Sequence, residues 1–142
     1  MPYKSFWMPE HAMILSDVRG TFTLSELKNM MEENITYMKQ TDHFVHIIID
    51  TRRLERIQFK IHEFSDMGLP SILPNTGWNI ILSDNPIFVF TASIIVQLLK
   101  NVRFRNLTTM EATVDFMASV EPLAQTLTLE KVNALVDSWE SS

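Results

Sequence analysis

One short run of residues constrains the fold of this chain more than any other feature. The run is FVHIIID, residues 44–50, which is apolar, rich in β-branched side chains and closed by an acid. A continuous apolar run too short for a helix is typical of a strand that is buried on both faces. We therefore expect a central strand in a mostly parallel sheet, with helices covering both sides.

Length and composition narrow the class of protein. The chain has 142 residues, 46% of them hydrophobic, which is enough for one domain with its own core. A net charge of −5 argues against the basic surface that nucleic-acid binding requires. The absence of cysteine excludes disulfides, thiolate nucleophiles and cysteine-bound metals. Without a leader pattern or an apolar run of the ~18–20 residues that span a membrane, we expect no membrane insertion and a cytoplasmic protein.

The residues before the central strand predict a hairpin and a helix. Two strand-like segments, 3–8 and 12–18, are separated by only three residues, as in an antiparallel hairpin. Thr23 and Glu26 have the spacing of a capping box, in which each side chain satisfies the other residue's free backbone amide. We expect a helix from there to about Lys39.

The residues after the central strand alternate between helix and strand patterns. We expect helices over 61–68, 86–100 and 109–120, strands over 78–82 and 102–107, and a final helix within 123–142. Asn85-Pro86 and Thr108 with Glu111 supply the helix starts. The order β-β-α-β-α-β-α-β-α plus a C-terminal helix predicts an α/β sandwich. Its five-stranded mixed, mostly parallel sheet carries helices on both faces and right-handed crossovers.

The last twenty residues form a separate extension in this prediction. Residues 1–122 make the domain, and residues 123–142 follow it. Leu129, Val132, Val136 and Trp139 fall on one stripe of a helix, and such a stripe must cover something apolar. We expect the extension to pack on the domain or on a second subunit.

Three stretches carry a resemblance to a known family. They read VRGTFTLSEL, HFVHIIIDTRRL and GWNIILSDNPIFVFTASIIVQLLKNVRFRNLTTMEATVDFM. With the predicted element order, they resemble the STAS domain of bacterial anti-sigma-factor antagonists, and a bacterial group described as STAS-like or SEC14-like. The resemblance covers roughly residues 3–120. It implies a non-catalytic regulatory or protein-interaction module.

The phosphorylation switch of that family does not carry over directly. Classical antagonists have a phosphorylatable serine in an Asp-Ser-Ser-Gly-like turn at the start of the second helix. The corresponding residues 54–59 contain neither a hydroxyl group nor a glycine. Thr51 is the nearest hydroxyl, but it sits earlier in the chain, so the resemblance does not assign it the role of that serine and leaves its phosphorylation open.

Ligands of open α/β sheets bind beyond the carboxyl ends of the strands. Residues 50–53, 83–85 and 107–109 should meet at that edge. The predicted ligand-binding residues are Asp50, Thr51, Arg52, Arg53, Arg56, Ser83, Asp84 and Asn85. The arginines and the helix start at Asn85 could hold an anion. In the alternative interpretation, which we favour, Asp50 and Asp84 neutralise the arginines and Asn85 only caps the helix.

His46 is the one candidate for catalysis. His43 and His46 are three residues apart, so on a strand they point to opposite faces and cannot hold a metal together. His46 with Asp17 and Asn79 would form a buried polar cluster, and with Asp17 or Asp50 a catalytic pair. A hydrogen-bonded core histidine is the favoured reading because no nucleophile or catalytic motif accompanies it. We expect no enzyme, no cofactor and no metal.

The helix predicted over 86–100 is apolar around most of its circumference, so its outer side also needs a cover. The tail helix, a second subunit or a bound apolar molecule could supply it. The predicted interface comprises Phe88, Phe90, Ile94, Ile95, Leu98, Leu99, Val132, Val136 and Trp139. We expect a homodimer that forms through this helix and the tail, with the loop from Arg52 to Arg56 next to the interface. The substitution Ile95→Glu or Phe88→Glu should disrupt the dimer.

Two further partners are compatible with the sequence. The interaction module could bind an unidentified protein. Alternatively, the chain carries or senses a small apolar or anionic ligand at the carboxyl end of the sheet, as the SEC14-like resemblance and an interior with nine Met and nine Phe suggest.

Overall fold

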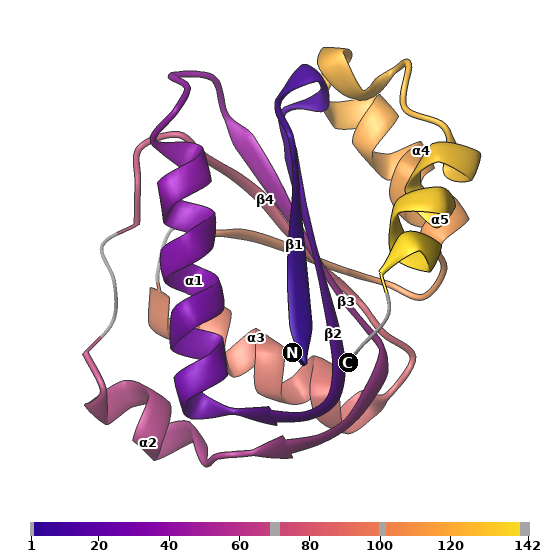
Figure 1. Cartoon of the computed structure of the whole chain (residues 1–142). Helices are drawn as coiled ribbons and strands as arrows, with labels where there is room; N and C mark the ends of the chain where they lie inside the picture. The colour runs from indigo at the N-terminus through magenta and orange to yellow at the C-terminus, as the bar shows by residue number, and fades with distance from the viewer. Residues whose placement is uncertain (1, 69–71, 100–101, 140–142) are drawn as a thin grey trace.

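The computed structural model describes residues 2–68, 72–99 and 102–139. Two helical layers enclose a five-stranded sheet of order β1-β2-β3-β4-β5 (Figure 1). The strands are β1 (Tyr3–Met8), β2 (Met13–Thr23), β3 (Val45–Gln58), β4 (Thr76–Leu82) and β5 (Arg103–Leu107). The helices are α1 (Leu24–Met38), α2 (Ile61–Asp66), α3 (Pro86–Leu99), α4 (Met110–Val120) and α5 (Leu129–Ser138). Only the β1–β2 pair is antiparallel, which confirms the predicted mixed α/β sandwich and its element order.

The topology decides which helices cover which face. Strands β2 to β5 lie side by side in chain order. Crossover connections of the same hand therefore place all the helices that join these strands on one side of the sheet. Helices α1, α2 and α3 accordingly share one face, and α4 and α5 cover the other after the last strand (Figure 1).

Alternation along the strands divides the interior into two cores. Ile48 of β3 faces α4 and α5, together with Met13 and Leu15 of β2. The next residue, Ile49, packs against the core under α1, α2 and α3. Because successive side chains of a strand point to opposite faces, one buried run serves both layers, as the sequence predicts for residues 44–50.

Strands β2 and β3 are both longer than predicted. They continue to Thr23 and Gln58, past the predicted ends at Val18 and Asp50. Two register shifts interrupt the β2–β3 pair, one of which leaves Glu55 opposite no residue of β2. Such a bulge shifts the alternation of side chains along the strand by one residue. Apolar residues three positions apart can therefore point to the same face of the sheet. The predicted loop from Arg52 to Arg56 is therefore wrong, and these residues form part of a strand.

Two of the three predicted helix starts are confirmed. The Thr23 hydroxyl accepts from the Glu26 amide at 3.2 Å, and the Glu26 carboxylate accepts from the Thr23 amide at 3.0 Å. The Asn85 side chain accepts from the Ile87 amide, the first N–H of α3 after Pro86, at 2.9 Å. For α4 the prediction was wrong by one residue, since Thr109 rather than Thr108 caps the helix.

Helix α5 fills the core opposite α3. Val132 and Val136 are buried among the residues of β2 and β3 that face α4. Trp139 is also buried, with the Arg19 guanidinium 4.4 Å from its ring centre. The tail therefore packs on its own chain and cannot cover α3, which lies across the sheet.

Candidate functional site

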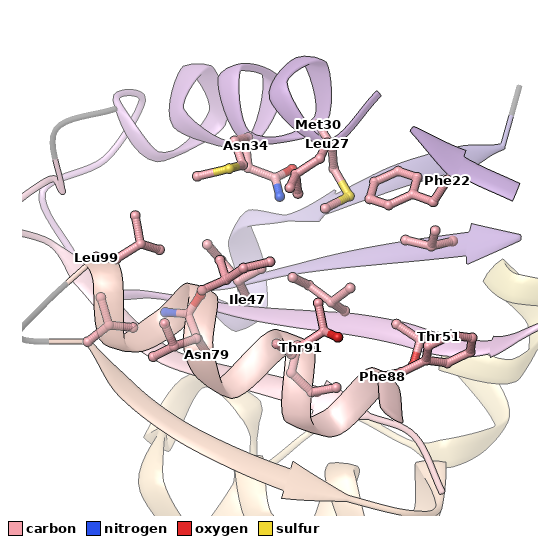
Figure 2. Close-up of a pocket in the computed structure, with 18 of the residues that line it drawn as sticks. Phe22, Leu27, Met30, Asn34, Ile47, Thr51, Asn79, Phe88, Thr91 and Leu99 are labelled. Atoms are coloured by element: carbon pink, nitrogen blue, oxygen red, sulfur yellow. The ribbon is translucent and has the colours of Figure 1, made fainter. Parts of the chain in front are cut away.

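A cavity of about 150 Å³ lies between α1, α3 and the sheet. Figure 2 shows Leu27 and Asn34 of α1 facing Phe88, Thr91 and Leu99 of α3 across it. Strands β2, β3 and β4 form its floor, and the cavity is partly open to solvent. Of the residues predicted from the sequence, Thr51 and the α3 residues Phe88, Ile95 and Leu99 line this cavity, but the sequence did not bring them together as one site.

The wall of the cavity is almost entirely aliphatic, methionine and phenylalanine side chains, with no charged residue among those described. Its polar members are Asn34, Thr51, Thr76, Asn79 and Thr91. The hydroxyl groups of Thr51 and Thr91 already donate to backbone carbonyls, at 3.1 and 2.9 Å. An apolar molecule fits this lining, whereas a charged group would lose its hydration without compensation.

Asn34 is the most buried polar group in the cavity wall. It occupies an inward position of α1 and is 4% exposed. Its Nδ2 donates to Ser16 Oγ at 3.1 Å, and Ser16 Oγ lies 2.8 Å from Ser5 Oγ. Its Oδ1 has no hydrogen-bond partner among the described residues. A polar chain thus runs from β1 through β2 to α1 and ends at a buried amide oxygen.

The charged residues predicted at the carboxyl end of the sheet pair with one another. Arg52 donates to both carboxylate oxygens of Asp50, at 3.0 and 2.9 Å. Arg53 lies 3.8 Å from Asp50 and 4.0 Å from Asp17, the residue opposite Asp50 on β2. Arg19 donates to Asp17 at 2.9 Å. Both carboxylates are fully buried. The cluster matches the predicted neutralisation of the arginines for Asp50, but the second carboxylate is that of Asp17 and not that of Asp84.

Burial and ion pairing shift the pKa values of two groups in this cluster, Asp17 and Arg52. Loss of hydration raises the pKa of Asp17, and the hydrogen bonds from Arg19 only partly oppose it. The Asp50 carboxylate raises the pKa of Arg52 by accepting its hydrogen bonds. The ion pair with Asp50 therefore stabilises the charge of Arg52, whereas burial disfavours the charge of Asp17.

The remaining predicted ligand residues do not share one pocket. Thr51 lies on the cavity side of β3, opposite to Asp50, and is 9% exposed. Ser83 is buried and accepts from the Asn85 amide, while Asp84 and Arg56 are exposed. No ion pair of Asp84 occurs among the described residues, so its predicted pairing with the arginines is wrong.

His46 is a hydrogen-bonded core histidine, the reading favoured from the sequence. The Trp78 amide donates to Nδ1 at 2.9 Å, so the proton of the neutral ring is on Nε2 and is donated to Glu121 Oε1, also at 2.9 Å. Burial lowers the pKa of His46, although Glu121 opposes the shift. The predicted partners are wrong: Asp17 pairs with Arg19, and Asn79 lies on the cavity face.

His43 joins the same carboxylate, against the prediction. Its Nε2 lies 2.9 Å from Glu121 Oε1, because β3 begins only at Val45 and strand alternation does not apply to residue 43. Burial raises the pKa of Glu121, but hydrogen bonds from the Leu123 amide and the two histidines outweigh it and lower the pKa overall. No group of three or more His, Asp or Glu side chains is arranged for a metal within residues 2–68, 72–99 and 102–139.

Some of the apolar side chains of α3 face the cavity, and others lie on the surface. Phe88, Ile95 and Leu99 line the cavity, while Ile94 and Leu98 are half-buried. Ile87 and Phe90 project outward and are 71% and 65% exposed. The predicted interface is therefore wrong in joining α3 to Val132, Val136 and Trp139, which are buried across the sheet.

Comparison with solved structures identifies the class of this fold as STAS-like. The chain is similar to the crystal structure of an uncharacterized protein of the DUF3478 family with a SpoIIAA-like fold, from Shewanella loihica PV-4. The TM-score is 0.55 at 10% identity, over 81% of this chain and 91% of the other. This likeness confirms the suspected fold. No family model and no curated protein sequence matches the chain. No helix among the described residues is long and apolar enough to cross a membrane.

Proposed function

We propose that this chain is a non-catalytic STAS-like module that binds a small apolar molecule between α1 and α3. The observation that carries the proposal is the cavity of about 150 Å³ with an uncharged, mostly hydrocarbon wall. Because the cavity is partly open to solvent, a small molecule could reach it from outside. A bound apolar molecule would restore the missing contacts, and cavities of this kind take up guests of about the size of benzene.

This site differs from the one expected at the carboxyl end of the sheet. The cavity lies on the face of the sheet, beneath the two helices that flank it. The apolar ligand is therefore favoured over the anionic one, because the arginines near Asp50 are paired and none of them lines the cavity.

Filling the cavity with a side chain tests the proposal. Ala92 of α3 lines it, so Ala92→Phe should occupy the space. Toluene added to ¹⁵N-labelled protein should shift amide signals of α1 and α3, and this response should disappear in Ala92→Phe. Ala134→Phe, at an exposed position of α5, is the matched control and should bind toluene normally. Equal binding by all three proteins, or binding by none, would contradict the proposal.

A homodimer through the outer face of α3 is a second candidate function. Its support is the exposure of Ile87 and Phe90, two large apolar side chains one turn apart. Light scattering coupled to size exclusion should then give a dimer for the native chain and a monomer for Phe90→Glu. Phe44→Glu, at an exposed site outside α3, should remain dimeric. Because Phe88 and Ile95 face inward, their substitution would disturb the core instead.

A further inference from the structure

We infer that the outer edge of β5 binds an acidic, extended peptide segment of a partner protein, with Arg103 and Arg105 as the anchoring side chains. The segment would lengthen the sheet by one strand, which is a recurring form of peptide recognition. None of the residues of β5 lines the cavity beneath α3, so this inference does not depend on the proposed ligand.

Strand β5 is the last strand of the sheet, so one of its edges has no strand beside it among the described residues. The Ser83 amide donates to the Leu107 carbonyl at 3.0 Å, which shows that the backbone groups of Leu107 point toward β4. Backbone groups of successive residues point to alternate sides of a strand in a parallel pair. Those of Phe104 and Asn106 therefore point away from β4, where a further strand could bind them.

The side chains of Arg103 and Arg105 share one face of β5 and lie over aromatic rings. The Arg103 guanidinium is 5.3 Å from the ring centre of Trp78 and 5.7 Å from that of Phe44. The Arg105 guanidinium is 4.6 Å from the ring centre of Phe116. Both arginines are exposed, and neither forms an ion pair among the described residues. A guanidinium that stacks on a ring keeps its N–H groups available for a carboxylate.

Charge complementarity favours an acidic segment at this edge. Every second side chain of a strand added beside β5 would lie on the same face as the two arginines, so acids at alternate positions could pair with both. The net charge of −5 argues against a nucleic acid as the partner.

A second copy of this chain fits the edge less well. Pairing between two β5 strands would place the arginines of both copies on the same face, and like charges across a strand pair are destabilising. The other edge strand, β1, would bring Lys4, which lies on the face of the sheet that carries Phe6 and α4. The same charges would therefore protect the free chain from association between copies.

A capped peptide of sequence Thr-Glu-Val-Glu-Val-Thr is the probe for this inference, titrated into ¹⁵N-labelled protein and followed by NMR. Its glutamates alternate with valines, so both can face the arginines. We expect the double variant Arg103→Gln, Arg105→Gln to bind it about tenfold more weakly, the effect of two exposed ion pairs. The double variant Lys28→Gln, Arg56→Gln removes two exposed positive charges elsewhere and should bind the peptide as the native chain does.

A second peptide tests the strand geometry. The sequence Thr-Val-Glu-Glu-Val-Thr has the same composition, but its adjacent glutamates point to opposite faces, so only one can reach the arginines. It should bind the native protein about two- to fivefold more weakly than the first peptide. Hydrogen exchange at the amides of Phe104 and Asn106 should slow when the first peptide is bound, because these amides would then donate to the added strand.

Four results would overturn the inference. The first peptide does not bind, the two peptides bind equally, the arginine variant binds as tightly as the native chain, or the control variant loses as much affinity. Binding without slower exchange at Phe104 and Asn106 would also contradict it, since the peptide would then lie away from the edge. If single-stranded oligothymidylate binds through the same arginines and the peptide does not, the surface recognises nucleic acid and the inference is wrong.

Discussion

At the scale of single residues, the unpaired amide oxygen of Asn34 lowers the stability of the fold. Its inward position on α1 would suit leucine, yet it carries a polar atom without a partner. Asn34→Leu should therefore raise the free energy of unfolding by about 1 kcal/mol, because the unpaired amide is removed and apolar surface is buried. Urea denaturation measures the change. Asn133→Leu, at an exposed position of α5, should stay within about 0.5 kcal/mol of the native protein, and a clear loss of stability in Asn34→Leu would contradict the reading of this site.

Gly77 has a steric role that depends on His46. A Cβ at residue 77 would lie 2.5 Å from Nδ1 of that ring, which the Trp78 amide and Glu121 hold in place. We expect Gly77→Ala to cost about 2 kcal/mol in thermal or urea unfolding. Most of this cost should disappear in a His46→Ala background, where the ring is absent. Equal costs in both backgrounds would place the strain elsewhere.

At the scale of elements, the contacts of His46 attach the C-terminal helices to the sheet. Glu121, at the end of α4, accepts from His46 of β3, and His11 Nδ1 lies 2.8 Å from the Leu123 carbonyl.

The lowered pKa of His46 means that the unfolded chain takes up a proton first as the pH falls below 6.5. The free energy of unfolding should therefore decrease between neutral pH and the folded-state pKa of His46.

His46→Gln checks this pH dependence, since glutamine does not titrate. Urea denaturation at a series of pH values should show a smaller decrease below pH 6.5 in the variant than in the native chain. His62→Gln, at an exposed position of α2, is the control and should leave the profile unchanged. Parallel profiles for His46→Gln and the native protein would assign the dependence to other groups.

Removal of the tail is a second prediction at this scale. A chain ending at Pro122 would uncover the core formed by Met13, Leu15 and Ile48, which Val132 and Val136 bury. We expect this truncated chain to aggregate or unfold, as measured by size exclusion with light scattering and by circular dichroism. A stable, monomeric truncated chain would show that α5 is dispensable.

The elements were largely predictable because their signals are local. The apolar run of residues 44–50 and the capping box at Thr23 depend only on neighbouring residues, and both are confirmed. The extension of β3 was missed because the bulge at Glu55 breaks the two-residue period on which strand prediction depends.

The candidate site was predictable only in outline. The apolar circumference of α3 predicted a cover for its outer side, and this stays a prediction because Ile87 and Phe90 are exposed. The exclusion of the tail as that cover follows from the topology, which places α5 across the sheet. The contact of His46 with Glu121 joins residues 75 positions apart, which no local spacing reveals. The unpaired oxygen of Asn34 likewise follows from packing between α1 and β2.

At the scale of the whole molecule, ligand binding should stabilise the fold. A molecule that binds only the folded chain adds about 2.7 kcal/mol at a concentration of a hundred times its dissociation constant. Toluene near saturation should therefore raise the Tm of the native protein. It should have a much smaller effect on Ala92→Phe, whose added ring occupies the cavity, as followed by calorimetry. An equal rise in both proteins would indicate binding elsewhere.

The most direct test of the proposal is a crystal structure of the chain soaked with iodobenzene, because the anomalous signal of iodine locates the guest. We predict a peak between α1 and α3, among Asn34, Ile49 and Ile95. A soaked crystal with no iodine there, and with the protein's own side chains closing the space, would contradict a ligand-binding role for this cavity.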